Sequence, residues 1–386
     1  MNKIVIAVDS FKGSLSTFQS GKAISEGIKQ VYKDVQTVIS PVADGGEGTV
    51  DAIVSAVNGE MVEVEVHNPL GKIIAGSYGI IPHTNTAVIE MSAAAGITLI
   101  NENERNPMNT TTYGVGEMIC DAVSKGCRDF VIGIGGSATN DGGVGMLQAL
   151  GFEFLNESGE QISCGAKGLE NLAEIRIGNA LPELSECTFR VACDVKNVLC
   201  GENGCSAVYG PQKGGTPEMI EKMDLWLDRY ADLTKTVIPD SDKNYPGAGA
   251  AGGMGFAFLS YLNAELQSGI DLVINETGLE EHIKDADAVI TGEGRLDGQS
   301  CMGKAPVGIA RIAKKYNKPV IAFSGSVTDD AVACNEHGID AFFPIVRKPC
   351  TLQEAMDCDT AYENLKDTVC QVFRLIDMCI KNEKGD

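Results

Sequence analysis

Three glycine-rich segments of the chain carry carboxylates. They are Asp44-Gly-Gly-Glu47-Gly, Asn140-Asp141-Gly-Gly-Val-Gly and Gly292-Glu293-Gly-Arg295-Leu-Asp297-Gly. Each follows a short apolar run that is typical of a strand and precedes a predicted helix. Glycine lets the backbone approach a ligand closely, and a helix start offers unpaired N–H groups to anions. Because carboxylates bind magnesium or act as a base, these loops point to an enzyme that handles a metal and a nucleotide.

The acids of the third segment, Glu293 and Asp297, are the hardest to explain as helix-capping residues alone. A helix start needs one acid, whereas Glu293 and Asp297 lie on either side of Arg295. We therefore expect the two carboxylates to hold a metal while Arg295 binds an anion. Asp194 directly follows the predicted strand Phe189–Cys193, and it is a candidate general base.

The acids of the first two loops have a simpler alternative. Asp44 fits as a helix cap with Glu47 in the first turn, positions that the helix dipole favours. The same explanation applies to Asp141. Functional and structural interpretations of these residues both stay open at this point.

A further segment comes close to a known phosphate-binding motif. Gly298-Gln-Ser-Cys-Met-Gly303-Lys304-Ala305 matches the P-loop pattern except at its last position, where Ala305 has no hydroxyl for Mg²⁺. The predicted strand also ends at Thr291, which leaves an acidic loop before the glycines. A Walker A site is therefore not expected. Lys304, near a helix start, is either a ligand of a phosphate or substrate carboxylate or a solvated lysine.

Two other glycine-rich segments are weaker candidates for phosphate binding. Gly133-Ile-Gly135-Gly136-Ser137 resembles a dinucleotide fingerprint, but no acidic residue ends a following strand at the distance that NAD binding requires. The segment Gly247-Ala-Gly-Ala-Ala-Gly252-Gly253-Met-Gly255 precedes a helix. It could cradle phosphates, or it could serve as a tight-packing or hinge segment.

The end of the first predicted strand also gathers reactive groups. Asp9-Ser-Phe-Lys12-Gly-Ser14 places an acid, two hydroxyls and a lysine within one turn. An open α/β sheet binds ligands at this end of its strands. Lys12 could neutralise a carboxylate or a moving phosphoryl group. The alternative is a plain turn with a surface lysine.

Histidine chemistry is not expected in this chain. The four histidines are scattered without metal-ligand spacing, and no G-x-S-x-G elbow supports a hydrolytic triad.

Composition limits the partners and the compartment. The net charge of −22 over 386 residues argues against nucleic acid or an anionic membrane as a partner. Thirteen cysteines, an odd number without a C-x-x-C pair, are best explained as buried free thiols in a reducing cytosol. No apolar run approaches the ~20 residues of a membrane span, and the N-terminal run is too short for a signal peptide. We therefore expect a cytoplasmic protein.

The predicted elements alternate between strand and helix at both ends of the chain. Strands are expected over residues 3–8 and 35–41, with helices starting after Ser16 and over Thr49–Val57. From about residue 270 the same rhythm returns, with expected strands over 288–291, 319–323 and 341–346. Between these ends, the runs 61–66, 73–81 and 86–89 suggest antiparallel strands.

The simplest architecture is therefore α/β with two domains. Residues 1–60 and 270–386 would form a Rossmann-like parallel-sheet domain from both chain ends, with a second α/β domain over residues 61–269 inserted between them. The acidic loops lie at the carboxyl ends of strands, so we expect a shared cleft to bring them together.

Seven segments, taken in order over essentially the full length, resemble the bacterial type-I family of glycerate kinases. They are Asp9-Ser-Phe-Lys-Gly-Ser-Leu-Ser16, Pro41-Val-Ala-Asp-Gly-Gly-Glu-Gly-Thr49, Gly133-Ile-Gly-Gly-Ser-Ala-Thr-Asn-Asp-Gly-Gly143, Ala192-Cys-Asp-Val195, Tyr209-Gly-Pro-Gln-Lys-Gly-Gly215, Gly247-Ala-Gly-Ala-Ala-Gly-Gly-Met-Gly255 and Thr291-Gly-Glu-Gly-Arg-Leu-Asp-Gly298.

The resemblance implies ATP- and Mg²⁺-dependent phosphorylation of D-glycerate. The expected acceptor is the 2-hydroxyl, giving 2-phosphoglycerate, and the 3-hydroxyl is the alternative. The enzyme would be a monomer or a homodimer. Two rival functions remain: a non-catalytic protein that binds a hydroxy acid, and a dehydrogenase that uses the Gly133–Gly136 loop.

Site roles follow from the resemblance as expectations. Asp194 or Asp44 would deprotonate the hydroxyl, and Lys12 and Arg295 would bind the glycerate carboxylate or the phosphoryl group. Mg²⁺ would be held by Glu293 and Asp297. The residues expected to bind ATP are Gly133, Gly135, Gly136, Ser137, Gly252, Gly253 and Lys304.

Overall fold

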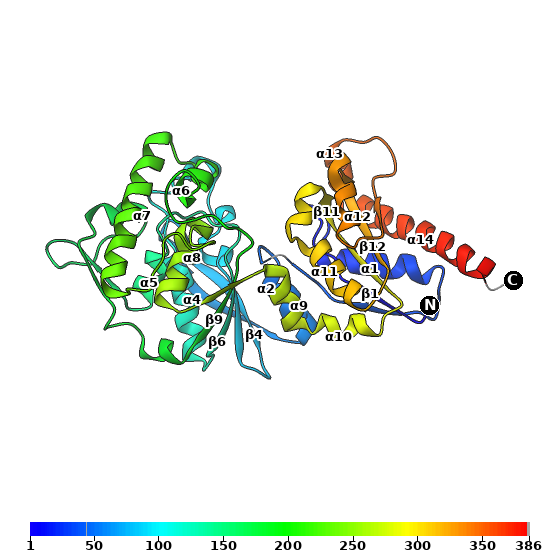
Figure 1. Cartoon of the computed structure of the whole chain (residues 1–386), viewed down its shortest axis with the longest axis horizontal. Helices are drawn as coiled ribbons and strands as arrows, with labels where there is room; N and C mark the ends of the chain where they lie inside the picture. The colour runs from blue at the N-terminus through cyan, green and yellow to red at the C-terminus, as the bar shows by residue number, and fades with distance from the viewer. Residues whose placement is uncertain (44, 384–386) are drawn as a thin grey trace. The chain divides into compact units, whose positions relative to one another are not determined.

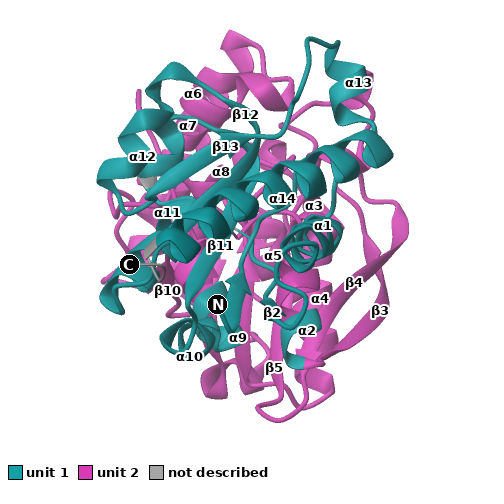
Figure 2. Cartoon of the chain, turned by 90° about the vertical axis from the view of Figure 1, so that its right-hand side faces the viewer, with its two compact units in different colours: residues 1–44, 55–57, 273–386 teal, residues 45–54, 58–272 magenta. Residues whose placement is uncertain are grey.

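The computed structural model describes residues 1–43 and 45–383. The chain divides into two compact units, which Figure 2 colours separately. Unit 1 comprises residues 1–44, 55–57 and 273–386, and unit 2 comprises residues 45–54 and 58–272. Both chain ends therefore contribute to unit 1. That residues 1–60 and 270–386 form a Rossmann-like domain, with a second domain over residues 61–269, stays a prediction.

Unit 1 contains a five-stranded, fully parallel sheet (Figure 1). Its order is β13 (Ala341–Pro344), β12 (Val320–Val327), β11 (Ala288–Leu296), β1 (Lys3–Ile6) and β2 (Gln36–Ile39). The N-terminal strand β1 lies between β11 and β2, with Ile4 in register with Ala288 and Thr37. The five strands expected at the chain ends are all present, with ends that differ by a few residues.

Helices surround this sheet and supply its core. They are α1 (Thr17–Lys29), α10 (Leu279–Lys284), α11 (Ala305–Lys315), α12 (Ala333–Glu336), α13 (Leu352–Met356) and α14 (Cys358–Glu383), with the short 3₁₀ helices η6 (Gly298–Met302) and η7 (Asp329–Val332). Helices α1 and α14 pack against each other, and Ile24 and Phe373 join Ile4 in one buried cluster. The helix predicted to start after Ser16 begins with a capping box, since Ser16 and Gln19 exchange hydrogen bonds.

Unit 2 contains a mixed six-stranded sheet. Its order is β10 (Glu265–Gln267), β9 (Thr188–Ala192), β6 (Asp129–Gly133), β5 (Thr86–Glu90), β4 (Ile73–Ile81) and β3 (Glu60–His67). The first four strands are parallel, whereas β5, β4 and β3 pair antiparallel, as expected from their sequences. A separate antiparallel pair is formed by β7 (Glu153–Leu155) and β8 (Glu174–Arg176).

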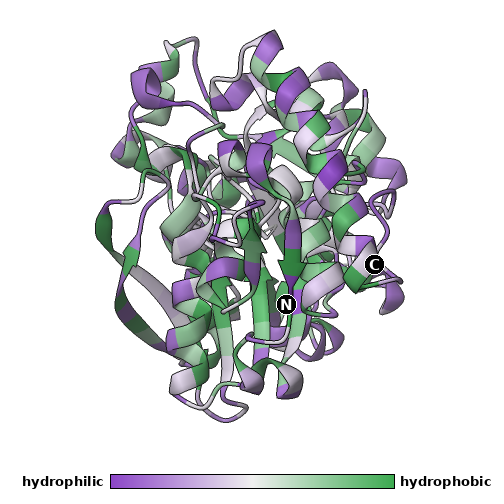
Figure 3. Cartoon of the chain, turned by 90° about the vertical axis from the view of Figure 1, so that its left-hand side faces the viewer, coloured by the Kyte–Doolittle hydropathy of each residue, from purple (hydrophilic) through white to green (hydrophobic). Residues whose placement is uncertain are grey.

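The helices of unit 2 enclose an aromatic core. They are α3 (Ser92–Ala95), α4 (Tyr113–Ser124), α5 (Val144–Ala149), α6 (Cys205–Tyr209), α7 (Pro217–Val237) and α8 (Ala250–Tyr261), with the 3₁₀ helices η1 (Ile97–Leu99), η2 (Glu102–Glu104), η3 (Ala166–Asn171), η4 (Pro182–Glu186) and η5 (Pro211–Lys213). Tyr230 is fully buried and meets Phe154 and Phe256 edge to face. Figure 3 shows hydrophobic residues along the strands of this unit and hydrophilic ones in its outer turns. The units divide within α2 (Thr49–Val57) and α9 (Gly269–Thr277).

One strand boundary departs from the expectation. The sequence predicts that the strand starting at Ala288 ends at Thr291, but β11 continues to Leu296. The extension has few apolar side chains and exists because β12 pairs with it as far as Leu296 opposite Val327. Glu293 and Arg295 therefore lie on a strand rather than in a loop, two residues apart and so on the same side of it.

No helix in the described part of the chain combines the length and apolar character needed to span a bilayer.

Candidate active site

Unit 1 has a cavity of about 460 Å³ at the carboxyl ends of its central strands β1, β11 and β12. Ligands of parallel α/β sheets bind at this end of the strands. Five residues that the sequence singled out line this one cavity: Lys12, Glu293, Arg295, Asp297 and Lys304.

Cations and carboxylates lie close together in this cavity. Lys304 Nζ is 3.7 Å from Glu293 Oε2 and 3.8 Å from Asp297 Oδ1. Arg295 Nε is 3.4 Å from Asp297 Oδ2, and its side chain is 65 % exposed. Lys12 and Asp9 add one further charge of each sign. The cavity thus supplies the local cations that an anionic substrate needs in a chain whose net charge is −22.

Ser300 connects the two acids of the cavity wall. Its buried hydroxyl donates a hydrogen bond to Glu293 Oε1, and the backbone N–H of Asp297 donates to Ser300 Oγ at 3.2 Å. Asp297 also accepts the Gln299 N–H at 3.0 Å and so caps η6. Sequence reasoning missed Ser300, although its place three residues after a capping aspartate was a signal.

The loop after β1 forms another wall of the cavity. The Asp9 N–H donates to the Gly292 carbonyl at 2.9 Å, which ties this loop to β11. Lys12 is exposed at the tip of the turn. Ser14 Oγ is buried and has no hydrogen-bond partner among the residues that the structure describes. Because buried polar atoms are normally satisfied, this hydroxyl fits a cavity that receives a polar ligand.

The donor set of the cavity fits magnesium that arrives with a nucleotide. Within residues 1–43 and 45–383, no three His, Cys, Asp or Glu side chains converge on a metal position. Mg²⁺ is usually held by one or two carboxylates together with waters and substrate phosphates rather than by an all-protein cage. Glu293 and Asp297 offer oxygen ligands of that kind, and the cavity leaves room for the rest.

In unit 2, the loop after β6 is tightly packed at its glycines. A Cβ atom added to Gly133 would lie 2.7 Å from the Gly45 carbonyl oxygen. At Gly135 it would lie 2.8 Å from the Cα of Gly46. Close backbone packing therefore requires both glycines. The next side chain, Ser137, is half-buried and its hydroxyl accepts a hydrogen bond from Lys213 at 2.7 Å.

The glycines at the start of α8 also have a packing role. Ala251, Gly252 and Gly253 have positive φ angles that interrupt the helix. A Cβ atom on Gly252 would lie 2.1 Å from the Thr139 carbonyl oxygen, and on Gly253 it would lie 2.7 Å from the Cα of Gly142. These contacts account for the glycines, and a role in phosphate binding stays a prediction.

Asp141 makes contacts in unit 2 that fit the structural interpretation. It is fully buried and accepts hydrogen bonds from Thr112 N–H and Oγ1 at 2.9 Å and from Gly143 N–H at 3.1 Å. Burial raises the pKa of Asp141, and these hydrogen bonds oppose that shift. Thr112 is the N-cap residue of α4, but its hydroxyl donates to Asp141 and accepts no hydrogen bond from an N–H of α4.

Known proteins resemble this chain over nearly its whole length. The model of the glycerate kinase family matches residues 4–377. The chain belongs to the glycerate kinase family. The glycerate 2-kinase of Escherichia coli strain K12 is 47 % identical over 97 % of each chain. The glycerate kinase of Haemophilus influenzae strain KW20 / Rd is 46 % identical over 97 % of this chain and 98 % of its own.

A solved structure agrees with this assignment. It is the crystal structure of a chain ascribed to glycerate kinase 2 from Salmonella typhimurium LT2. It matches with a TM-score of 0.90 at 46 % identity, covering 98 % of this chain and 99 % of that one. The α/β fold class expected from the sequence is thereby confirmed.

The remaining expected site residues of this glycerate kinase family member lie in unit 2 or outside the described residues. Asp194 is exposed in the loop after β9, where its Oδ1 accepts the Gly269 N–H at 3.2 Å. Asp44 lies outside the described residues. Gly252 packs against the carbonyl of Thr139, which lies two residues after Ser137, so Gly252 lies close to the end of the Gly133–Ser137 loop. That all these residues share one cleft stays a prediction.

Proposed function

We propose that this protein transfers the γ-phosphoryl group of ATP to D-glycerate. The acceptor is the 2-hydroxyl and the product is 2-phosphoglycerate, in keeping with the name of the Escherichia coli relative. The observation that carries the proposal is the cavity of unit 1 in a member of the glycerate kinase family. Its three cationic side chains, Lys12, Arg295 and Lys304, suit a substrate pair that carries a carboxylate and a triphosphate.

The cations of this cavity bind and orient the anionic groups. Lys12 and Arg295 are exposed enough to reach a ligand, and they hold the glycerate carboxylate or the transferring phosphoryl group. Lys304 lies at the N-cap of α11 and binds an ATP phosphate. Phosphoryl transfer is catalysed mainly by such positioning and charge neutralisation, with the hydroxyl attacking in line.

A carboxylate deprotonates the acceptor hydroxyl. We assign this role to Asp194 or Asp44, both of which follow strands in sequence. Asp194 is exposed and therefore accessible to a substrate hydroxyl. A general base must come within hydrogen-bond reach of the proton that it removes when the substrate is bound.

Mg²⁺ is part of the proposal, with Glu293 and Asp297 as its protein ligands. When bound, the ion supplies positive charge that neutralises the phosphates during transfer. Ser300 holds Glu293, and the cap of η6 holds Asp297, so both carboxylates have fixed orientations before any ligand arrives.

The ATP phosphates are assigned to the glycine-rich loops. Gly133, Gly135, Gly136 and Ser137 follow β6, and Gly252 and Gly253 precede the regular part of α8. We also place the reaction in the cytoplasm, because the thirteen cysteines are free thiols and free thiols persist in a reducing compartment.

Phosphorus NMR of the reaction mixture tests the proposal. The protein is incubated with ATP, Mg²⁺ and D-glycerate, and we expect the resonance of 2-phosphoglycerate to grow as ATP is consumed. The Glu293→Gln variant is the control, with turnover lower by orders of magnitude and an unchanged fold. A 3-phosphoglycerate resonance would refute the assigned hydroxyl. A mixture without any phosphorylated glycerate would refute the activity.

A further inference from the structure

Unit 2 buries a lysine that the roles assigned above do not use. Lys213, at the end of η5, is 2 % exposed. Its ammonium donates hydrogen bonds to Ser137 Oγ and to the Thr139 carbonyl, both at 2.7 Å. Among the described residues, no carboxylate forms an ion pair with it. A charged group that is buried without a carboxylate partner is expensive, and such groups concentrate at functional sites.

The environment of Lys213 disfavours its charge. Burial lowers the pKa of Lys213 to about 8, although the neighbouring Cys205 and Asp141 oppose that shift. Methionine would fill a similar volume without this cost. We therefore attribute the lysine at this position to the hydrogen bonds that its ammonium donates. One of these hydrogen bonds goes to the half-buried hydroxyl of Ser137.

The hydrogen bond from Lys213 determines what Ser137 can do. A serine hydroxyl has one proton to donate and two lone pairs to accept with. Because Lys213 fills a lone pair of Ser137 Oγ, the hydroxyl proton has to point away from Nζ, toward another acceptor. Ser137 then acts as a donor, and its acidity is increased by the cation that bonds to it.

The loop around Ser137 is fixed and lies at the surface. The Ile97 N–H donates to the Gly136 carbonyl at 2.9 Å, and the Ala138 N–H donates to the Ala95 carbonyl at 2.9 Å. Gly136 itself is exposed and has a φ of +73°, a conformation that glycine adopts without strain. A polarised hydroxyl on an anchored, exposed turn can donate to an oxygen of a bound ligand.

We propose that Lys213 is a positioning residue that holds Ser137 as a hydrogen-bond donor to an oxyanion of a substrate. The inference rests on the proposed function, which provides two such oxyanions, a phosphate of ATP and the carboxylate of D-glycerate. Lys213 does not touch the substrate itself. It acts through Ser137, which makes the direct contact.

Isothermal titration calorimetry with ATP–Mg²⁺ and with D-glycerate, each alone, tests the inference. The variants are Ser137→Ala, Lys213→Met and their combination. A hydrogen bond to a charged group is worth roughly 1.5–3 kcal/mol, so Ser137→Ala should weaken one of the two ligands about 10- to 100-fold. Lys213→Met should weaken the same ligand, and the double variant should bind no more weakly than Ser137→Ala. The affected ligand identifies the oxyanion.

Matched variants separate positioning from a structural role. Lys243→Met removes a lysine of unit 2 that pairs with Asp228 and Asp232, and it should leave both affinities unchanged. Ser137→Thr retains the hydroxyl and should restore binding. If Lys213→Met does not fold, as judged by circular dichroism, Lys213→Gln keeps an N–H donor and should bind within a few-fold of wild type.

Three results would overturn the inference. They are unchanged affinities in both single variants, additive losses in the double variant, and equal binding by Ser137→Ala and Ser137→Thr. A wild-type protein that binds both ligands but makes no phosphoglycerate by NMR would refute the proposed function instead, so the two failures are distinguishable.

Discussion

The ammonium of Lys304 lies 3.7 Å from the carboxylate of Glu293, at the end of the parallel sheet of unit 1. The same ammonium is 3.8 Å from Asp297. One protein cation therefore already lies within ion-pair distance of both carboxylates to which we assign Mg²⁺. Mg²⁺ therefore has to compete with the ammonium of Lys304 for the carboxylates of Glu293 and Asp297. Variants of Lys304 should change the affinity for Mg²⁺ for this reason.

Lys304→Met should lower kcat and strengthen Mg²⁺ binding. The loss of a cation beside the transferring group costs about 10²-fold in rate. The freed carboxylates attract the divalent ion more strongly, so half-maximal activity should occur at a lower Mg²⁺ concentration. Steady-state rates over a Mg²⁺ titration measure both effects.

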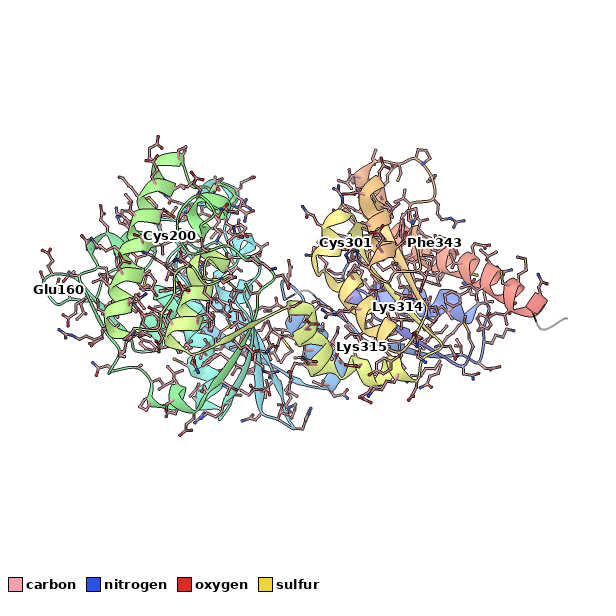
Figure 4. All side chains as sticks on the ribbon, viewed as in Figure 1. Glu160, Cys200, Cys301, Lys314, Lys315 and Phe343 are labelled. Atoms are coloured by element: carbon pink, nitrogen blue, oxygen red, sulfur yellow. The ribbon has the colours of Figure 1, made fainter. Side chains whose placement is uncertain are left out.

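Lys315→Met is the matched control for this experiment. Lys315 is labelled in Figure 4, lies at the end of α11, the helix that Lys304 begins, and is paired with Glu280 at the surface. Its variant should behave as wild type. An unaltered kcat in Lys304→Met would contradict the role of Lys304 in binding the phosphate during transfer.

Ser300→Ala should reduce kcat by about tenfold without unfolding the protein. The substitution removes the donor to Glu293 Oε1 and so loosens a proposed metal ligand, and loss of such supporting contacts typically costs 10–100-fold in metal affinity or activity. Ser324→Ala is the control, because that buried serine donates to the backbone carbonyl of Glu293 and not to its carboxylate. Equal kinetics for the two variants would contradict the positioning role of Ser300.

Asp194→Asn should lower kcat by about 10²- to 10⁴-fold while the KM for ATP stays within a few-fold, because the amide cannot accept the proton of the glycerate hydroxyl. Glu202→Gln, an exposed acid of the same unit, should be silent. Initial-rate kinetics decide this, and wild-type turnover in Asp194→Asn would leave Asp44 as the assigned base.

Asp141→Asn should destabilise unit 2 by about 1–3 kcal/mol. The carboxylate accepts from Thr112 and Gly143, and an amide nitrogen in either oxygen position would face an N–H donor. Urea unfolding followed by circular dichroism measures the change. Unaltered stability together with lost activity would mean that Asp141 acts in catalysis rather than in structure.

The stability contributed by Lys213 should depend on pH. Burial lowers its pKa from 10.5 to about 8 in the folded protein, so between these values the unfolded chain binds a proton that the folded protein has lost. The contribution of this lysine to the free energy of unfolding therefore rises with pH across this window, by at most about 1.4 kcal/mol per pH unit. Below pH 8 both states are protonated and the contribution is constant.

Urea unfolding of wild type and Lys213→Met at pH 7.5, 8.5 and 9.5 measures this contribution. Wild type should gain stability relative to the variant as the pH rises. Burial raises the pKa of the Cys205 thiol to about 11, so this thiol stays protonated in folded wild type at these pH values. It stays protonated in the variant as well, because the charge of Lys213 lowers the pKa of Cys205, and its contribution is therefore the same in both proteins. Lys243→Met is the control, since the hydrogen bonds that Lys243 donates to Asp228 and Asp232 raise the pKa of Lys243 and keep it protonated. Parallel curves for wild type and Lys213→Met would contradict the shift.

Local sequence patterns predicted those helices and strands whose ends are determined by nearby residues. The helix Thr49–Val57 and the strand Ile73–Ile81 have the predicted bounds, because Asn58-Gly59 follows the first apolar run and Pro82 follows the second. The pairing of β3, β4 and β5 followed from alternation along the strands. Five of the polar residues that line the cavity of unit 1 were also identified, four because they lie near predicted strand ends and Lys304 because it lies near a predicted helix start.

Long-range contacts decided the features that sequence reasoning missed. β11 extends to Leu296 only because β12 lies beside it, and nothing in the residues 292–296 signals that partner. Lys213 lies between a glutamine and two glycines, a setting typical of a surface loop, yet the fold buries it against Thr139. Burial of this kind depends on residues about 75 positions away in the chain and has no local signature.

The central position of β1 has a consequence for synthesis on the ribosome. This strand pairs with β2 on one side and with β11, which begins at Ala288, on the other (Figure 1). A nascent chain therefore carries an apolar N-terminal strand with one open edge until some three quarters of translation is complete. The segment 58–272 is contiguous and can acquire its structure first, so during most of elongation that open edge is a site where other chains can pair.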